Sequence, residues 1–388
     1  MTAPEDVEDV ALGALDSAHQ VALHVLRFGP LPRGAVARAM GLSAGSLTRL
    51  SKPLIDGGLL VETEPVTDPA TRRPTRPLDV AVAAHRFVGV DVTGTDAWAV
   101  LTDLRVNVSA SARVTLEGTT PAHIADAVAW LVAELADGPP VGIGVALGGH
   151  VDAAGRVVHA DFLGWRTPVD LGGLVAERTG APVVVGNDLA CLTRAEHWFG
   201  LGREHPSFAV LTVGAGVGYG LVLGDRAVQT PDTSLQLLGH LSLDRSGPRC
   251  PEGHRGCASA LLTTTALLTA AHLATGTPTT WPQLLADAVD GDVRARRVLD
   301  DAAGHLGQLV AVVAGTTGVT QVLLGGEGVD LAVVGHDSLR AAIDEHRDAR
   351  AQQVELTVRD HDFHVWARGA AGAAVHDFTS SPRWLTAP

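Results

Sequence analysis

The chain contains few residues of several types, and each of these shortages excludes certain classes of protein. It has one tyrosine, two methionines and three cysteines in 388 residues, and 19% of its residues are charged against 46% hydrophobic. An odd number of cysteines (Cys191, Cys250 and Cys257) in a long chain argues against a disulfide framework and for reduced thiols. The apolar content supports a large buried core and excludes intrinsic disorder.

Long hydrophobic runs and a basic leader are also missing. The sequence has no uninterrupted apolar stretch of about eighteen residues, the length that would cross a membrane. The segment 1–16 carries five acidic and no basic side chains, the opposite of the start of a signal peptide. We therefore expect a cytoplasmic protein that does not contact a membrane, with residues 1–16 as a flexible acidic N-terminus.

Charge is distributed unevenly along the chain. The formal net charge is −14, but residues 17–86 hold nine Lys and Arg against five Asp and Glu, and residues 87–388 hold twenty against thirty-three. A basic segment therefore precedes an acidic body. This asymmetry indicates a nucleic-acid contact, and it is also compatible with an ordinary solvated surface.

The basic segment has the pattern of a winged helix-turn-helix over residues 17–82. Apolar residues at helical spacing predict a helix that the tripeptide FGP ends, and RGAVARAM predicts a second helix that stops at Gly41. Ser43 is expected to cap a third helix with a leucine-rich face. Two short apolar strands, LLV and LDVAV, then flank a basic turn. Two helices joined by a tight glycine-containing turn and followed by such a hairpin indicate a DNA-binding domain.

The outer face of the third helix and the basic turn carry the expected DNA contacts. The helix has no acidic residue before Asp56, and the turn has three arginines within five residues. The predicted contacts are Ser43, Ser46, Thr48, Arg49, Lys52, Arg72, Arg73 and Arg76. A three-helix module for protein docking or dimerisation is the alternative interpretation.

From residue 85 onward the pattern changes to α/β. FVGVDVTGTDAWAVLTDL reads as a strand, a Gly-containing turn and a second strand, and FAVLTVGAGVGYGLVLGD repeats this pattern downstream. Two such hairpins, each preceding further αβ segments, indicate an internal duplication. Their turns could bring backbone amides to the phosphates of a nucleotide, although most tight glycine turns are only turns.

These segments together resemble the ROK family, which contains bacterial sugar kinases and, with an added N-terminal winged helix, transcriptional repressors and activators. The resemblance covers residues from about 17 to about 378 and rests on VGVDVTGTD, FLGW, NDLA, AEHWFG, LTVGAGVGYGLVL, GH with a following C…GHRGC, and LLGGEGV, in this order. It implies an α/β fold, the two-lobed actin-like ATPase (ribonuclease H-like) duplication. Within a domain of residues 85–388 we expect a first lobe at about 85–205, a second at about 206–360, and a C-terminal helix that packs back.

The resemblance also assigns roles to residues of the body. Asp188, beside Asn187, matches the general base of the family's kinases, here expected to be vestigial. Asn187, Asp188 and His240 remain as polar groups for a small ligand. Three polar sugar contacts of the family are replaced, by Phe162, Leu237 and Ser259. Loss of these partners predicts weak sugar binding.

The phosphate turns depart from the kinase pattern as well. Asp96 stands where the kinases have a cation, Thr93 adds a side chain where phosphate approaches closely, and Ala215 replaces a hydroxyl in the second turn. ATP is therefore not an expected cofactor. We interpret the protein as a non-enzyme whose ATP and sugar sites are degenerate.

The family's structural zinc site is also altered. Its pattern of one His and three Cys reads here His240, Cys250, Glu252 and Cys257, so a carboxylate replaces one thiolate. A carboxylate can ligate zinc, and His254 is a further candidate. The alternative is a Gly-rich loop with two inert thiols.

The sequence thus predicts a transcriptional regulator that binds a double-stranded DNA operator and responds to a small effector, which could be a sugar. A homodimer or homotetramer is the expected assembly. The two alternatives are a ROK sugar kinase that phosphorylates a hexose with ATP, and a catalytically dead partner-binding protein.

Overall fold

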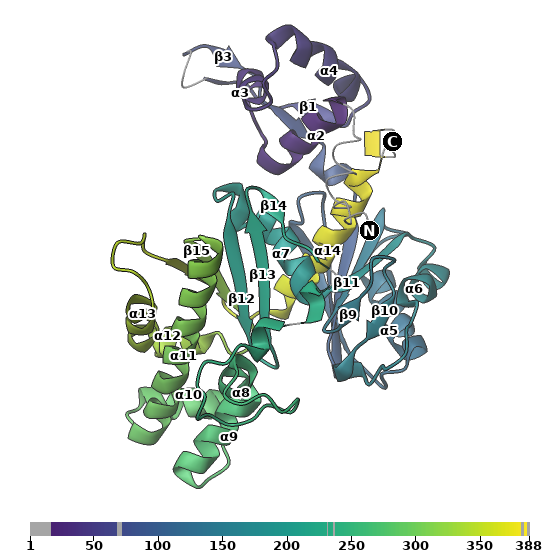
Figure 1. Cartoon of the computed structure of the whole chain (residues 1–388). Helices are drawn as coiled ribbons and strands as arrows, with labels where there is room; N and C mark the ends of the chain where they lie inside the picture. Colours follow the sequence, from purple (N-terminus) through teal and green to yellow (C-terminus); the bar gives the residue numbers. More distant parts are fainter. Residues whose placement is uncertain (1–16, 68–71, 231, 236, 382–383, 386–388) are drawn as a thin grey trace, which may run out of the picture. The chain divides into compact units, whose positions relative to one another are not determined.

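The computed structural model describes residues 17–67, 72–230, 232–235, 237–381 and 384–385 (Figure 1). The expected flexible N-terminus, residues 1–16, lies outside them. The chain divides into two compact units. Unit 1 comprises Met1–Gly148, Ala154–Cys191 and Ala367–Pro388, and unit 2 comprises Gly149–Ala153 and Leu192–Trp366.

Unit 1 begins with a winged helix module. Its elements are α2 (Ser17–Phe28), α3 (Arg33–Ala39), α4 (Ala44–Asp56), β1 (Leu60–Glu62), β2 (Val66–Thr67), β3 (Pro74–Thr75), β4 (Leu78–Val80) and the 3₁₀ turn η1 (Val82–Ala84). Strand β1 pairs antiparallel with β4, and β2 pairs with β3. The apolar face of α2 is fully buried, as its helical spacing predicts: Val21, Ala22, Val25 and Leu26 have no exposed surface.

The rest of unit 1 is built on a five-stranded sheet in the order β11-β8-β5-β6-β7. The strands are β5 (Phe87–Val92), β6 (Asp96–Thr102), β7 (Val108–Thr115), β8 (Gly142–Leu147) and β11 (Val183–Asn187). Strands β5, β6 and β7 form an antiparallel meander, whereas β8 and β11 are parallel to β5. The other elements of this unit are β10 (Val157–His159), η2 (Asp161–Leu163), α5 (Pro121–Leu135) and α6 (Leu171–Thr179).

Helix α14 (Phe363–Ser380) packs directly on this sheet, and two glycines make that possible. A Cβ at Gly89 would collide with the carbonyl oxygen of Ala367, and one at Gly144 with that of Ala370. The facing side of α14 is rich in alanine and glycine, so helix and strand backbones approach closely. Helix α14 therefore packs on β5 and β8.

Unit 2 contains a second five-stranded sheet in the order β14-β13-β12-β15-β16. Its strands are β12 (Phe208–Val213), β13 (Val217–Leu223), β14 (Arg226–Ala227), β15 (Gln321–Gly325) and β16 (Glu355–Val358), and β9 (His150–Val151) also belongs to this unit. The helices are α8 (Ala258–Leu262), α9 (Thr264–Thr275), α10 (Trp281–Val289), α11 (Val293–Thr317), α12 (Asp330–Val334) and α13 (His336–Glu345). Three 3₁₀ turns complete it: η3 (Leu201–Arg203), η4 (Thr233–Leu235) and η5 (Leu237–His240). The long helix α11 supplies much of the core.

The two sheets have the same topology, which confirms the expected duplication. In each sheet an antiparallel hairpin is extended on one side by a third antiparallel strand and on the other by two parallel strands. Helices α7 (Asp188–Phe199) and α14 follow the last strand of each sheet, and the unit boundaries fall inside them. No helix of the described residues is both long and apolar enough to cross a membrane.

Candidate functional site

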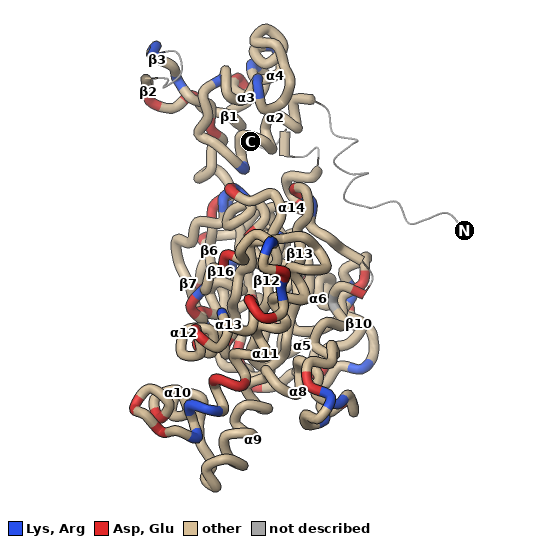
Figure 2. Tube along the Cα trace, turned by 60° about the vertical axis from the view of Figure 1, so that its left-hand side comes forward, with Lys and Arg blue, Asp and Glu red and all other residues tan. Residues whose placement is uncertain are grey.

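Helix α4 of the winged module has one buried and one exposed face. Leu47 and Leu54 are buried, whereas Thr48, Arg49 and Lys52 are exposed. Burial of the leucines fixes the rotation of the helix, so these three predicted DNA contacts share its outer face. Figure 2 shows Lys and Arg along α4 and at β3 of the same module.

Hydrogen bonds at the start of α4 hold two of the predicted contacts. Ser43 is the N-cap, as the sequence predicts: its Oγ accepts a bond from the Ser46 amide at 3.1 Å. The Lys52 ammonium lies 3.2 Å from Asp56 one turn later. Arg49, by contrast, is exposed and forms no ion pair with any described residue. The DNA contacts themselves stay predictions.

The wing presents the three predicted arginines. Arg72, Arg73 and Arg76 are all exposed and flank or follow the short strand β3. Arg72 has a φ of 59°, a left-handed conformation that a turn requires. Three cations on one short hairpin suit phosphate or minor-groove contacts.

Arg105 ties the winged module to the sheet of unit 1, a contact that sequence analysis missed. It lies between β6 and β7, and its guanidinium donates to the carbonyls of Val25 (2.9 Å) and Leu26 (2.8 Å) near the end of α2. It also pairs with Asp79 of β4, and the side chains of both residues are largely buried, at 13% and 16% exposure. Arg105 and its two partners in α2 are about eighty residues apart in the sequence, so no local pattern could have indicated these bonds.

The last turns of unit 1 also contact α2. The His19 imidazole hydrogen-bonds the carbonyl of Thr379 in α14, and its ring packs edge-on against Trp384 with centroids 5.5 Å apart. Both rings are almost completely buried. The winged module is therefore in contact with the C-terminal segment as well as with the β6–β7 turn.

The first Gly-containing turn, between β5 and β6, is closed by its own threonine. The Thr93 hydroxyl accepts from the amides of Thr95 (3.3 Å) and Asp96 (3.0 Å) and donates to the Asp96 carbonyl (3.0 Å). These are backbone amides that a phosphate-binding turn would direct at its ligand. In this chain the side chain of Thr93 satisfies them.

The Asp96 carboxylate, which stands where the kinases have a cation, forms its hydrogen bonds within the sheet. Arg113 on β7 donates to it at 2.9 and 3.0 Å, and the Thr95 and Thr115 hydroxyls donate at 2.8 and 3.0 Å. Burial alone would raise the pKa of Asp96, but these hydrogen bonds hold it below its ordinary value. The same Arg113 guanidinium lies 4.4 Å from the ring centre of Trp98. Asp96 is therefore a structural anion.

Phe162 and Asp188 lie close together in unit 1. A Cβ at Gly148 would meet the Phe162 ring at 3.1 Å and Asp188 Oδ2 at 3.4 Å, and Phe162 is 57% exposed. Asn187 ends β11, and its Oδ1 accepts a bond from the Ala190 amide at 3.1 Å. The polar pair predicted from the sequence thus stands at the carboxyl end of β11, next to an exposed aromatic ring.

The second Gly-rich turn, between β12 and β13, contacts a carboxylate that sequence analysis did not single out. The Ala215 amide donates to Glu327 Oε2 at 2.9 Å. Glu327 follows the two glycines at the end of β15. The motif LLGGEGV contained this residue, but nothing local indicated which backbone group it would bind.

Three of the predicted metal ligands come together in unit 2. The ligand atoms of His240, Cys250 and Cys257 all lie within 4.8 Å of one another. His254 adds a second imidazole, whose Nδ1 lies 3.5 Å from Cys250 Sγ. Glu252 is outside the group of three, but its carboxylate hydrogen-bonds the Cys250 thiol.

The pKa values in this group reflect its burial and its hydrogen bonds. Burial and the bond to Glu252 raise the pKa of the Cys250 thiol. The bond to Cys250 lowers the pKa of Glu252, with further help from the two nearby histidines. The donor set fits zinc, which takes thiolate and imidazole ligands in a tetrahedral arrangement.

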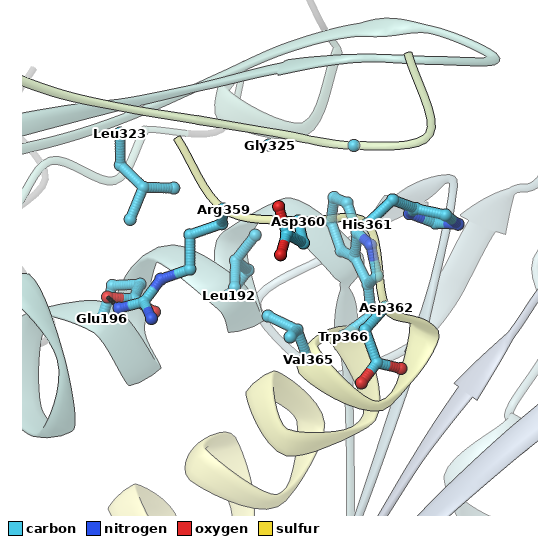
Figure 3. A pocket seen from close by; sticks show the side chains of 11 residues that line it. Leu192, Glu196, Leu323, Gly325, Arg359, Asp360, His361, Asp362, Val365 and Trp366 are labelled. Atoms are coloured by element: carbon cyan, nitrogen blue, oxygen red, sulfur yellow. Dashed lines mark hydrogen bonds and ion pairs between the residues drawn. The ribbon is translucent and has the colours of Figure 1, made fainter. Parts of the chain in front are cut away.

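A hollow in unit 2 has no counterpart in the sequence predictions. It is lined by the end of β15, the segment after β16 and the adjoining faces of α7 and α14 (Figure 3). On one side Arg359 points at Glu196, 3.0 Å away, and the Glu196 side chain is only 1% exposed. Glu196 Oε2 also accepts from the Leu201 amide at 3.0 Å. This side of the hollow is therefore an ion pair between a buried carboxylate and a partly exposed arginine.

Comparison with known proteins assigns the chain to a protein family. The model of the ROK family matches residues 87–376, about three quarters of the sequence. The chain belongs to the ROK family. The winged module lies outside the matched residues.

Individual ROK relatives are distant. The DNA-binding transcriptional repressor Mlc of Escherichia coli K12 is 24% identical over 318 residues, which cover 77% of this chain and 78% of Mlc. A solved ROK family transcriptional regulator, a homologue of E. coli Mlc, aligns with a TM-score of 0.76 at 22% identity and covers 95% of this chain and 99% of its own.

The kinase branch of the family aligns with less of the chain. A ROK glucokinase from Streptomyces griseus, solved with glucose and AMPPNP, aligns with a TM-score of 0.63 at 24% identity and covers 75% of this chain and 99% of its own. These structural likenesses establish the actin-like fold of the body.

Proposed function

We propose that this chain is a DNA-binding transcriptional regulator whose winged module reads a double-stranded operator. The observation that carries the proposal is the exposed face of α4, where Thr48, Arg49 and Lys52 stand over a buried leucine face. Side chains of these types hydrogen-bond base edges and phosphates, and the arginines of the wing add backbone contacts.

The relatives support this proposal. Mlc is named as a DNA-binding repressor, and the solved regulator covers almost the whole chain, whereas the glucokinase covers three quarters of it. A ROK body preceded by a winged module is the arrangement expected of the family's regulators rather than of its kinases.

Two local features argue against ATP-dependent sugar phosphorylation. In unit 1 the amides of the turn after β5 bond the Thr93 hydroxyl, and in unit 2 the Ala215 amide bonds Glu327. Phosphoryl transfer depends on positioning the phosphates and neutralising their charge, which such turns do poorly. We propose that the chain is not a kinase and that Asp188 is a vestigial general base.

The effector is proposed to be a small molecule that contacts Asn187 and Asp188 at the end of β11 in unit 1. A ligand contact of His240 stays a separate prediction from the sequence. The exposed Phe162 ring beside Asp188 favours a ligand with an apolar face in addition to hydroxyl groups, which a sugar ring also offers. Binding would change the population of conformations in which two winged modules of a homodimer or homotetramer fit a two-fold operator.

Zinc is proposed as a structural ion of the loop that follows η5. His240, Cys250 and Cys257 would supply three ligands, with Glu252 or His254 as the fourth. The ion would crosslink the segments that carry these ligands, where Cys250 and Cys257 are buried in a small cluster with Ala260.

The test of the DNA proposal is fluorescence anisotropy with the full-length protein and Arg49→Ala on DNA from the chain's own upstream region. Loss of one base-contacting arginine is expected to weaken specific binding roughly 10- to 100-fold. The matched control is Arg297→Ala, which removes another exposed arginine, from α11 in unit 2, and should leave DNA affinity unchanged. Equal affinities of the two variants would instead favour a partner-binding role for the winged module.

A further inference from the structure

The turn between β6 and β7, residues 103–107, carries Arg105 and, directly after it, a residue with left-handed backbone. Val106 has a φ of 52° and no exposed surface. Left-handed backbone is rare for a β-branched residue, because its side chain crowds the main chain there. Such a conformation persists only where neighbouring bonds hold it, so the contacts of this turn show what keeps Val106 in place.

Hydrogen bonds hold the turn from within and from outside. Within it, the Asp103 carboxylate accepts from the Arg105 amide at 2.8 Å and from the Asn107 amide at 3.0 Å. The Asp103 carbonyl accepts from the Val106 amide at 3.1 Å. From outside the turn, Arg368 of α14 donates its Nε to the Val106 carbonyl at 3.0 Å. An arginine that lies 262 residues away in the sequence therefore bonds the left-handed residue itself.

Arg105 connects this turn to the end of α2. Its guanidinium donates to the carbonyls of Val25 and Leu26, which lie in the last turn of that helix. A cation is favourable there, because the last carbonyls of a helix lack partners within it. Gly29 leaves space for this contact: an added Cβ would lie 2.9 Å from Arg105 Nη2 and 2.9 Å from Asp79 Oδ1. The end of α2 is thus held from the β6–β7 turn.

Helix α14 also holds the start of α2. The His19 imidazole hydrogen-bonds the carbonyl of Thr379, which lies three turns after Arg368 in α14. Both ends of α2 are therefore attached through contacts that α14 makes or supports. Since α14 begins with residues of unit 2 and ends in unit 1, it connects unit 2 to both attachments of the winged module.

We propose that Arg368 is a positioning residue of the winged module. By holding Val106 in its left-handed conformation, Arg368 fixes the turn from which Arg105 binds the end of α2. It thereby fixes the attachment of the DNA-reading helices to the sheet of unit 1. This inference rests on the proposed function, in which the winged module reads DNA. Its test uses no DNA, so the two proposals succeed or fail separately.

Hydrogen exchange of α2 in the full-length chain tests the proposal with the variants Arg368→Ala and Val106→Gly. Glycine adopts a positive φ readily, so a chain with Val106→Gly does not need Arg368 to hold the turn. Arg368→Ala is expected to speed exchange in α2 about tenfold or more when Val106 is present. In the Val106→Gly background the same change should have less than about a twofold effect. Because glycine also removes buried side-chain atoms, the effect of Arg368→Ala is compared within each background.

Two further variants keep the test decisive. Arg178→Ala removes another arginine of unit 1 that donates to a main-chain carbonyl, that of Leu174, and must leave exchange in α2 unchanged. Arg368→Met keeps an apolar stem without the donor, must behave like Arg368→Ala, and serves if the alanine variant does not fold. Unaltered exchange of α2 in the Arg368 variants would overturn the proposal. Equal acceleration in both backgrounds would overturn it as well, because Arg368 would then stabilise unit 1 without acting through Val106.

Discussion

Arg359 and Arg350 both pair with a carboxylate in unit 2, but their surroundings differ. Arg359 bonds Glu196, whose side chain is 1% exposed, whereas the side chains of Arg350 and Asp348 are 90% and 53% exposed. Removing one member of a buried pair leaves a charge without compensation, while an exposed pair is screened by water. The two arginines therefore differ in what they contribute to stability.

We expect Arg359→Ala to lower the free energy of unfolding by about 2 kcal/mol, less than for a fully buried pair because Arg359 is itself 43% exposed. Arg350→Ala should lower it by less than about 0.5 kcal/mol. Urea denaturation followed by circular dichroism measures both. Equal losses would show that the Glu196 carboxylate is solvated and not buried.

Tyr219 on β13 gives a spectroscopic prediction, because it is the only tyrosine of the chain. Burial raises its pKa to about 12. Absorbance at the phenolate band should therefore stay flat through pH 10 in the folded protein and rise near pH 12, whereas in denaturant it should rise near pH 10. Since the folded pKa is the higher one, this group stabilises the fold below pH 10, and its contribution is lost between pH 10 and 12. Ionisation of the folded protein at pH 10 would place Tyr219 at the surface.

Individual residues also show where sequence patterns mislead. The sequence places the acidic residue Asp96 at the first Gly-containing turn, but it does not indicate its partner. That partner, Arg113, lies on the neighbouring strand β7, and only the register of the sheet brings the two side chains together. Glu327 is likewise invisible as a partner of Ala215, because 112 residues separate them. Local sequence patterns identify which residues are acidic or glycine-rich, but tertiary contacts determine which partners these residues bind.

At the scale of the elements, Arg105 in the β6–β7 turn allows a direct test of what holds the winged module to the sheet of unit 1. Its guanidinium bonds two carbonyls of α2 as well as Asp79 of β4, so it satisfies the helix end and neutralises a largely buried acid. Loss of this side chain should loosen α2 and β4 without affecting unit 2.

We expect Arg105→Ala to cost the winged module about 3 kcal/mol, seen as faster amide hydrogen exchange in α2 and β4 with unchanged exchange in β12 and β15. Arg113→Ala is the matched control, since Arg113 pairs with Asp96 on the next strand but does not touch α2. Unaltered exchange in α2 after Arg105→Ala would mean that apolar packing alone holds the module.

The loop from His240 to Cys257 gives the prediction for metal. The protein should contain one zinc ion per chain, measured by mass spectrometry of the metal content, and Cys250→Ser should lose it because a thiolate ligand is removed. Cys191→Ser, which alters a buried thiol in α7, should keep zinc. Comparison of Glu252→Ala with His254→Ala assigns the fourth ligand. Retention of zinc by Cys250→Ser would exclude this site.

Elements with strong local signals could be predicted from the sequence. The apolar face of α2, the Ser43 cap, the leucine face of α4 and the two Gly-turn hairpins all follow from periodicity and turn chemistry. The hollow beside Arg359 could not be predicted, because its walls come from three separate stretches of the sequence. Nor could the contact of α14 with Gly89 and Gly144, which depends on backbone proximity between distant parts of the chain.

At the scale of the whole molecule, one β-sheet plan occurs twice, and a basic module precedes it. The matching strand order of the two sheets follows from the repeated hairpin motif, so the α/β duplication was accessible from the sequence. The division of charge, with a positive excess confined to residues 17–86, is the molecular feature that most directly favours DNA as a partner.

The most direct measurement is therefore the affinity of the full-length protein for DNA from its own upstream region and for a random duplex, across a series of salt concentrations. A regulator is expected to prefer its operator by about a thousandfold or more, with affinity for both DNAs falling steeply as salt rises. Absence of both the preference and the salt dependence would contradict DNA recognition by the winged module.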